Sequence, residues 1–407
     1  MSRHYAFFGP PAHGHIQPML PVAAELVRRG DHVTFATTTR FASAVAATGA
    51  EVLPYEPVVQ DFATAVPAGS PDWLALAMKA TVEESEALVP ALDARLSEDL
   101  PDLLVYDATM NMAGRVLGRA WNRRGVETFP VFLPQPSGGG AFSLTGLVTP
   151  PDDPASERPA ARLFRSALTD FMARHGAGDV TPLELVTGFG GQRLVFFPRE
   201  FQPGGEHFDA RHAFVGPCAD ISPAAEPTWR PPAEGSPVVL VSLGTTWGRN
   251  ADFFRACAKS FGDSPWHAVL AVGPNGVTPE SLGPLPPNVE VHRWLAYRDV
   301  LPHARAFVGA AGMGSLMLAL AHGVPLVLAP QSGEQSMVAR RSVELNLGAE
   351  LPAGELSADS VLDTTDAVTR DDTVKAAVAA MRRRIEAAGG VARAADILQA
   401  QAGAARE

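Results

Sequence analysis

The first forty residues alternate short apolar runs with an amphipathic stretch, a pattern that predicts a strand, a helix and a second strand. Residues 5–8 (YAFF) form one apolar run, and residues 33–36 (VTFA) form another. Between them, residues from about 17 to 29 place apolar side chains on one helical face, and Gly30 stands where a left-handed residue commonly ends a helix. Strands joined through a helix by short loops pair in parallel, so this unit predicts a parallel sheet.

The same alternation continues to the end of the chain. In the N-terminal half it predicts a long helix within 73–96, a strand at 103–106, a helix through Val116 and Trp121, and a strand at 126–133. A second series then predicts strands at 238–244, 268–272, 289–291, 306–308 and 326–328, with helices near 253–261 and 316–321. Two amphipathic helices, at about 373–388 and 392–401, close the chain.

A proline-rich segment between the two series indicates two domains. Six prolines lie between residues 217 and 237, a composition typical of an interdomain linker. We therefore predict an α/β fold of two Rossmann-like domains that face each other across a cleft. The predicted parts are an N-terminal domain (1–216), a linker (217–236), a C-terminal domain (237–385) and a helix (386–407) that packs back on the N-terminal domain. Ligands of such sheets bind beyond the carboxyl ends of the strands.

Composition excludes several classes of partner and location. The chain has 407 residues and a formal net charge of −11, and it contains no run rich in lysine or arginine, so we expect neither nucleic acid nor an anionic membrane surface as a partner. Two cysteines cannot form a disulfide framework, which favours a reducing cytoplasm. No stretch has the form of a signal peptide or membrane span, so we expect a cytoplasmic protein without membrane insertion.

The turn after the first strand contains two histidines, His13 and His15. His15 lies at the carboxyl edge of the predicted sheet, and Asp107 ends the strand at 103–106 and is expected in the same crevice. A carboxylate within hydrogen-bond reach of an imidazole fixes its tautomer and stabilises the imidazolium, as a general base requires. We therefore predict a His15–Asp107 dyad, and we assign His13 a structural role.

Several segments resemble the bacterial macrolide glycosyltransferases, two-domain (GT-B) inverting enzymes of the UDP-glycosyltransferase family. The resemblance covers essentially the whole chain. Its most recognisable segments are AHGHIQP at 12–18, RRGDHVT at 28–34, PDLLVYD at 101–107, VLVSLG at 239–244 and GGVARAA at 389–395. It implies that His15 deprotonates the acceptor hydroxyl, that Asp107 orients His15, and that the alkoxide attacks the anomeric carbon of a nucleotide sugar.

The resemblance also implies the binding residues and the ligands. The acceptor is a hydrophobic small molecule of macrolide or polyketide type, contacted by Trp73, Met110 and Phe142. The donor is a UDP- or TDP-sugar used as co-substrate, without metal or other cofactor. The residues implied to bind this donor are Ser242, Gly244, Thr245, Trp294, Gly312, Gly314, Ser315, Glu334 and Gln335.

The donor region departs from the family pattern. The histidine that contacts the diphosphate in the family is replaced by Ala310, and the glutamate that contacts the ribose is replaced by Leu318. Tyr297 stands where the family has glutamine in its Trp-x-Pro-Gln element. One charge-assisted phosphate contact is worth roughly 1.5–3 kcal/mol, so losing the histidine weakens donor binding or its transition state by ~10–150-fold.

Two other functions therefore stay open. An intact dyad beside an altered donor site also suits base-catalysed cyclisation, elimination or isomerisation of a natural product without a sugar nucleotide. A non-catalytic auxiliary protein is the third hypothesis, although such a protein has no physical reason to keep both dyad residues. The sequence leaves the acceptor, the sugar, the nucleotide base and the oligomeric state open, a homodimer included.

Overall fold

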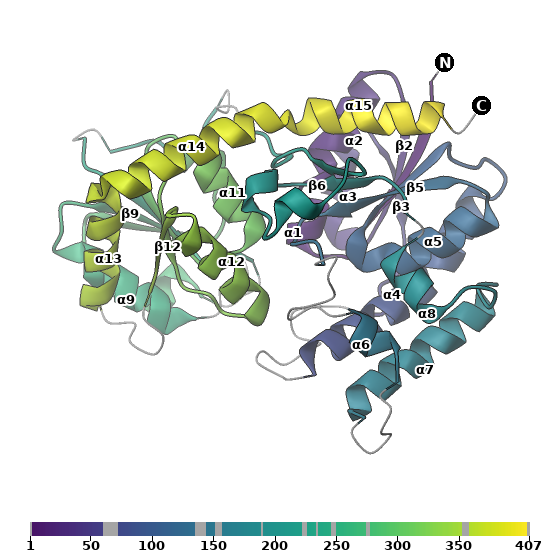
Figure 1. Cartoon of the computed structure of the whole chain (residues 1–407). Coiled ribbons are helices and arrows are strands. Elements are labelled where there is room, and N and C mark those ends of the chain that lie inside the picture. Colours follow the sequence, from purple (N-terminus) through teal and green to yellow (C-terminus); the bar gives the residue numbers. More distant parts are fainter. Residues whose placement is uncertain are drawn as a thin grey trace. The chain divides into compact units, whose positions relative to one another are not determined.

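The computed structural model describes residues 2–59, 72–134, 144–150, 157–188, 190–221, 226–232, 235–245, 250–273, 277–351 and 358–404. The chain divides into two compact units, coloured along the sequence in Figure 1. Unit 1 consists of Met1–Cys218 together with Ala388–Glu407, and unit 2 consists of Ala219–Ala387. The C-terminal segment thus returns to unit 1.

Unit 1 is built on a seven-stranded parallel sheet with the strand order β3-β2-β1-β4-β5-β6-β7. Its strands are β1 (His4–Phe8), β2 (His32–Thr37), β3 (Glu51–Pro54), β4 (Leu103–Asp107), β5 (Arg124–Phe129), β6 (Arg193–Val195) and β7 (His212–Phe214). Its helices are α1 (His13–Ile16), α2 (Met19–Arg28), α3 (Thr39–Ala46), α4 (Trp73–Leu96), α5 (Asn111–Ala120), α6 (Leu144–Val148), α7 (Pro159–Arg174), α8 (Pro182–Thr187) and α15 (Gly390–Gly403), with 3₁₀ turns η1 (Ala108–Met110), η3 (Arg199–Phe201) and η4 (Gly205–His207).

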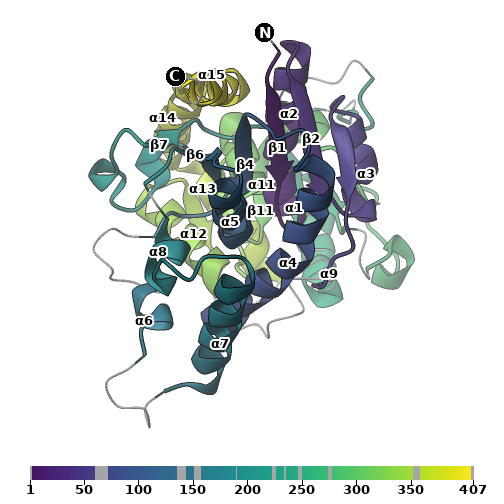
Figure 2. The ribbon, with the colours of Figure 1, turned by 90° about the vertical axis from the view of Figure 1, so that its right-hand side faces the viewer.

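Two hydrophobic cores cover the two faces of this sheet. One core joins the strands to α4, α5, α7 and α8, which lie together in Figure 2, and Leu88 and Phe164 are fully buried in it. The other joins the opposite face to α2 and α15, with Met19, Leu26 and Leu398 fully buried. Because a hydrophobic core covers each face, the sheet is the middle of three layers, as is typical of parallel sheets.

Unit 2 repeats the architecture with a six-stranded parallel sheet of order β10-β9-β8-β11-β12-β13. Its strands are β8 (Val238–Ser242), β9 (His267–Ala271), β10 (Val289–His292), β11 (Ala304–Gly309), β12 (Leu326–Leu328) and β13 (Gly348–Glu350). Its helices are α9 (Ala251–Gly262), α10 (Tyr297–Val300), α11 (Met313–Ala321), α12 (Gly333–Glu344), α13 (Ala358–Arg370) and α14 (Asp372–Ala388), with the 3₁₀ turn η5 (Pro279–Leu282).

Each sheet has one position where the strand order reverses. In unit 1 the chain moves outward from β1 to β3 and then returns to the other side of β1 with β4. In unit 2 the same reversal falls between β8 and β11. Loops on the two sides of such a switch point diverge and leave a crevice at the carboxyl edge, where ligands of open α/β sheets bind.

Two predicted boundaries are wrong. The strand predicted at 126–133 ends at Phe129, because the next residue, Pro130, has no amide hydrogen to donate to a neighbouring strand. The helix predicted to start near residue 17 starts at Met19 as α2. It is preceded by the short helix α1, in which the main-chain carbonyl of Ala12 accepts from the amides of His15 and Ile16. The segment with the two histidines is thus partly helical.

The described part of the proline-rich segment is bound to unit 2. The amide and the hydroxyl of Thr228 both donate to Asp299 Oδ2 at 2.7 Å. The indole of the buried Trp229 donates to Glu290 Oε2 at 2.9 Å. This stretch is therefore held by side-chain hydrogen bonds to α10 and β10.

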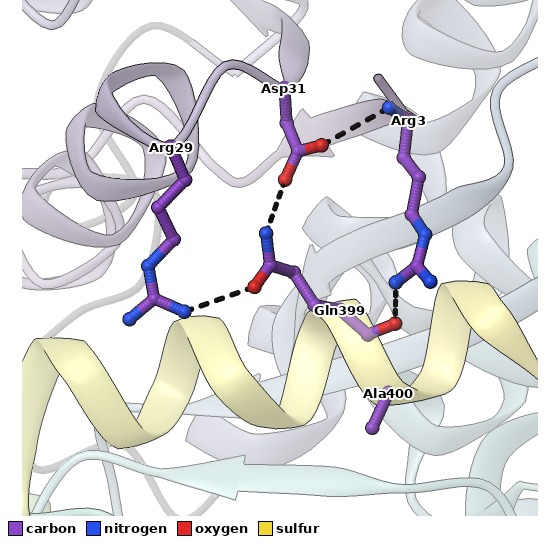
Figure 3. Close-up of a pocket in the computed structure, with 5 residues that line it drawn as sticks. All are labelled: Arg3, Arg29, Asp31, Gln399 and Ala400. Carbon is purple, nitrogen blue, oxygen red and sulfur yellow. Dashed lines mark hydrogen bonds between the residues drawn. The ribbon is translucent and has the colours of Figure 1, made fainter. Parts of the chain in front are cut away.

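The predicted pair of closing helices is confirmed as α14 and α15, separated by Gly389 with φ +88°. Figure 3 shows how Gln399 of α15 is held on unit 1: its side-chain amide donates to Asp31 Oδ2 at 2.7 Å, and its side-chain carbonyl accepts from Arg29 at 3.0 Å. Its main-chain carbonyl also accepts from Arg3. A polar hollow of about 450 Å³ lies among these residues, before the amino ends of β1 and β2. This hollow is on the edge opposite to the switch point, and we assign it to helix docking.

No helix in the described part of the chain has both the length and the apolar composition needed to cross a membrane.

Candidate functional site

His15 and Asp107 meet at the switch point of unit 1. His15 lies in α1, directly after β1, and Asp107 is the last residue of the neighbouring strand β4. His15 Nδ1 lies 3.0 Å from Asp107 Oδ2. The imidazole side chain is 22% exposed and the carboxylate is fully buried. The predicted proximity of the two residues is thus confirmed.

The hydrogen bond determines which imidazole nitrogen can act as a base. A carboxylate only accepts hydrogen bonds, so the shared proton lies on Nδ1 of His15. The basic lone pair of the neutral ring is then on Nε2, directed away from Asp107. Buried next to the ring, the carboxylate stabilises the positive charge that forms when Nε2 takes up a proton.

The Asp107 carboxylate has further partners on the 3₁₀ turn that follows β4. Its Oδ1 accepts from the amide of Thr109 at 2.8 Å and from the Thr109 hydroxyl at 2.6 Å. Asp107 is therefore the N-cap of η1, a position where aspartate is strongly preferred. One oxygen caps the turn while the other contacts His15.

Gly9 permits the close approach of β1 to Asp107. A β-carbon at Gly9 would lie 3.3 Å from Cβ of Asp107, a tight contact, and 3.6 Å from Cδ1 of Ile16, an ordinary van der Waals distance. A β-carbon at Gly14 would meet nothing within 4 Å. Gly9 is thus the more closely packed of the two glycines beside the dyad.

His13, for which a structural role is predicted, packs against an aromatic ring of α3. Its ring makes an edge-on contact with Phe41, with the centroids 4.8 Å apart. Burial, together with the nearby Arg40 guanidinium, lowers the pKa of His13 below the usual value for histidine. His13 thus differs from His15, which has a carboxylate partner.

The three residues predicted to contact an acceptor have different surroundings. Trp73 is the first residue of α4 and is half-buried. Met110 is fully buried in the hydrophobic core between the sheet and α4. Phe142 lies outside the described residues.

The turn between β11 and α11 lies at the switch point of unit 2. Gly309 ends β11, Gly312 is the N-cap of α11 and Gly314 lies in its first turn. The Ser315 hydroxyl donates to the Gly312 carbonyl at 3.1 Å. Ala311 has φ +61° although it carries a β-carbon, and it is fully buried. Strained backbone of this kind concentrates at ligand sites.

Ser242 and Gly244 shape the facing strand end of unit 2. The Ser242 hydroxyl donates to the Ala271 carbonyl at 2.9 Å and accepts from the Gly244 amide at 3.1 Å. Gly244 has φ +73°, which favours glycine. The proton of the Ser242 hydroxyl is therefore bound to β9, and its oxygen is bound to the turn at Gly244. Thr245 follows as a half-buried residue.

Trp294 and Tyr297 follow β10, and Tyr297 is the first residue of α10. Trp294 is 62% exposed, which is unusual for a side chain of this size. Tyr297 packs against Phe307, with ring centroids 6.1 Å apart, and its hydroxyl pairs with Ser242. Burial raises the pKa of the Tyr297 hydroxyl.

Glu334 and Gln335 lie in the first turn of α12. Ser332 caps this helix, accepting from the Gln335 amide at 3.3 Å. The side-chain carbonyl of Gln335 accepts from the Gln331 amide at 2.8 Å, which holds the preceding loop. The remaining polar group of Gln335 is its side-chain NH₂.

The contact of Thr109 with Asp107 was not predicted from the sequence, although aspartate side chains often accept a hydrogen bond from the amide two residues further on.

Within the described ranges, no group of three or more His, Cys, Asp or Glu side chains is arranged to hold a metal ion.

Comparisons with known proteins show the family of this chain. Residues 268–399 match the family of erythromycin biosynthesis protein CIII-like C-terminal domains. Demethyllactenocin mycarosyltransferase of Streptomyces fradiae is 35% identical, covering 97% of this chain and 86% of that protein. Oleandomycin glycosyltransferase of Streptomyces antibioticus is 31% identical, covering 99% of this chain and 92% of that protein.

One solved structure is similar to this chain over nearly its whole length. The calicheamicin glycosyltransferase CalG4 shares 37% identity and a TM-score of 0.83, covering 99% of both chains. The chain belongs to the macrolide-type glycosyltransferases of GT-B fold. The predicted fold class and the family resemblance are therefore both confirmed. This glycosyltransferase has His15 hydrogen-bonded to Asp107 in unit 1, and Ala310 and Leu318 in unit 2.

Proposed function

We propose that this protein is an inverting glycosyltransferase that moves a sugar from a nucleoside-diphosphate sugar to a hydroxyl group of a hydrophobic natural product of macrolide or polyketide type. The observation that carries the proposal is the 3.0 Å hydrogen bond between His15 and the buried Asp107 in a chain of this family. Relatives whose names specify antibiotic glycosylation support the acceptor class.

In the proposed reaction, His15 Nε2 takes the proton of the acceptor hydroxyl while Nδ1–H stays bonded to Asp107. The acceptor oxygen forms a bond to the anomeric carbon as the bond from that carbon to the diphosphate oxygen breaks. The nucleoside diphosphate leaves from the opposite face, so the anomeric configuration is inverted. General-base catalysis of this kind typically contributes 10²–10⁴-fold to the rate.

Unit 2 is the proposed donor-binding part. The glycines at 312 and 314 leave room for a phosphate close to the backbone, and the amides at the start of α11 are potential donors to it. The exposed indole of Trp294 suits stacking on a nucleotide base. We propose that Ser242, Gly244, Thr245, Ser315, Glu334 and Gln335 complete this site.

A turnover assay tests the proposal directly. The protein is incubated with UDP- and TDP-sugars and a panel of macrolide and polyketide alcohols, and products are detected by mass spectrometry. We expect a product heavier than its acceptor by one glycosyl group, with inverted anomeric configuration by NMR. Absence of any donor-dependent product across the panel would reject the proposal.

The residues at 310 and 318 favour a second candidate, base-catalysed conversion of a natural product without a sugar nucleotide. Ala310 is buried and Leu318 is half-buried, and neither can bond a diphosphate or a ribose through its side chain. In this case the same panel would yield an isomer or a dehydrated product in the absence of any donor, and His15→Ala would abolish it.

Donor affinity should increase when the family's histidine is restored. We expect Ala310→His to tighten TDP or UDP binding by ~10–150-fold in calorimetric titration, because one charge-assisted hydrogen bond to phosphate contributes roughly 1.5–3 kcal/mol. Ala310→Phe is the matched control, since it adds a ring without a donor, and it should not tighten binding. Equal dissociation constants for the histidine variant and the native protein would show that residue 310 does not contact the nucleotide.

A further inference from the structure

We propose that Thr109 is a positioning residue for the His15–Asp107 pair. Its hydroxyl donates to Asp107 Oδ1 at 2.6 Å and its amide donates to the same oxygen at 2.8 Å. The other oxygen, Oδ2, is the one that His15 contacts at 3.0 Å. Thr109 therefore holds one oxygen of the carboxylate while the other oxygen faces the imidazole. The inference rests on the proposed role of His15 as the base.

The torsion of the Asp107 carboxylate makes such positioning necessary. Rotation about the Cβ–Cγ bond of aspartate is broad and nearly two-fold, so a single hydrogen bond from His15 does not determine the carboxylate plane. Asp107 is fully buried, and water cannot compensate for a poorly oriented oxygen. Two donors on Oδ1 fix the plane from the opposite side.

Capping of the 3₁₀ turn does not require the hydrogen bond that the Thr109 hydroxyl makes to Asp107. An N-cap aspartate needs only a main-chain amide from the turn, and the Thr109 amide already provides it. The hydroxyl adds a second, shorter bond to the same oxygen. Since Thr109 contacts Asp107 and not the imidazole in these hydrogen bonds, it acts through Asp107.

The kinetic test replaces Thr109 by valine, which has nearly the same shape and no hydroxyl. We expect Thr109→Val to lower kcat about tenfold while the KM values for donor and acceptor stay within about twofold, because the change affects the base and not the binding surfaces. Thr109→Ser keeps the hydroxyl and should restore kcat to within about threefold of the native value.

Thr128→Val is the matched control. Thr128 pairs with Asp107 across the β4–β5 ladder, but its hydroxyl donates to the Tyr106 carbonyl at 3.4 Å. The same substitution there removes a buried hydroxyl one strand away without touching the carboxylate. We expect its kcat to stay within about twofold of the native value.

A spectroscopic measurement separates this inference from the proposed function. In protein labelled with ¹⁵N-histidine, the nitrogen shifts of His15 report the fraction of neutral ring with its proton on Nδ1. We expect that fraction to fall in Thr109→Val and to recover in Thr109→Ser, even if no sugar is transferred. Unchanged shifts and kcat in the folded valine variant, or failure of serine to restore them, would overturn the positioning role. Absence of turnover in the native protein would instead count against the proposed function.

Discussion

Replacing His15 by alanine is expected to lower kcat for sugar transfer by about 10²–10⁴-fold, the usual contribution of a general base. Without the imidazole, the acceptor hydroxyl would have to lose its proton to water, while the buried Asp107 would lose one of its donors. The donor KM should change little, because the proposed nucleotide contacts are in unit 2. Steady-state kinetics with each substrate varied in turn measure both quantities.

His13→Ala is the matched control for this experiment. It removes the same side chain from the same short helix, and His13 packs on Phe41. We expect this variant to lose some thermal stability and to keep kcat within a few-fold. Retention of more than a tenth of native kcat by His15→Ala would place the base on another residue.

The location of the dyad could be predicted because it depends on topology. His15 follows the first strand and Asp107 ends the strand that pairs with it, so any parallel sheet in which these strands are neighbours brings the two residues to one edge. Apolar runs of four or more residues identified those strands. The distance between His15 and Asp107 and the orientation of the carboxylate also depend on the turn at Thr109, and the periodicity of apolar residues does not predict the hydrogen bonds of that turn.

Sequence patterns were least informative where elements are short. The strands β6 (RLV) and β7 (HAF) have three residues each and lack a continuous apolar run such as that of β12 (LVL), and no element was predicted there. Similarly, the role of Ser242 depends on the carbonyl of Ala271, which comes close only because β8 and β9 are paired. Contacts of this kind are formed between segments and cannot be predicted from either one alone.

Glu127 is a third case in which partners come from distant segments. It lies within the predicted strand at 126–133, where its charge interrupts an apolar pattern. In the structure its carboxylate pairs with Arg115 of α5 and, at 3.2 Å, with Arg193 of β6. The Arg115 and Glu127 side chains are 4% and 7% exposed, so both charges are buried.

We expect Glu127→Leu to lower the free energy of unfolding by about 3–5 kcal/mol, because it leaves the Arg115 guanidinium buried without its charge partner. The double variant Arg115→Met, Glu127→Leu should recover most of that loss, because the buried guanidinium of Arg115 is then removed together with its partner. Arg193 also loses Glu127, but it stays bonded to His212 and to the Thr187 carbonyl. Urea unfolding followed by circular dichroism measures both variants.

The exposed ion pair on the same helix provides the contrast. Arg119 of α5 pairs with Asp179 at 2.6 Å, with side chains that are 37% and 65% exposed. Asp179→Ala should cost no more than about 1 kcal/mol, because solvent already screens this pair. If Glu127→Leu lowered the free energy of unfolding by no more than Asp179→Ala does, Arg115 would have to reach water when its partner is removed. A double variant as unstable as Glu127→Leu would mean that the pair itself, and not the unpaired charge, stabilises the packing of α5 beside Asp107.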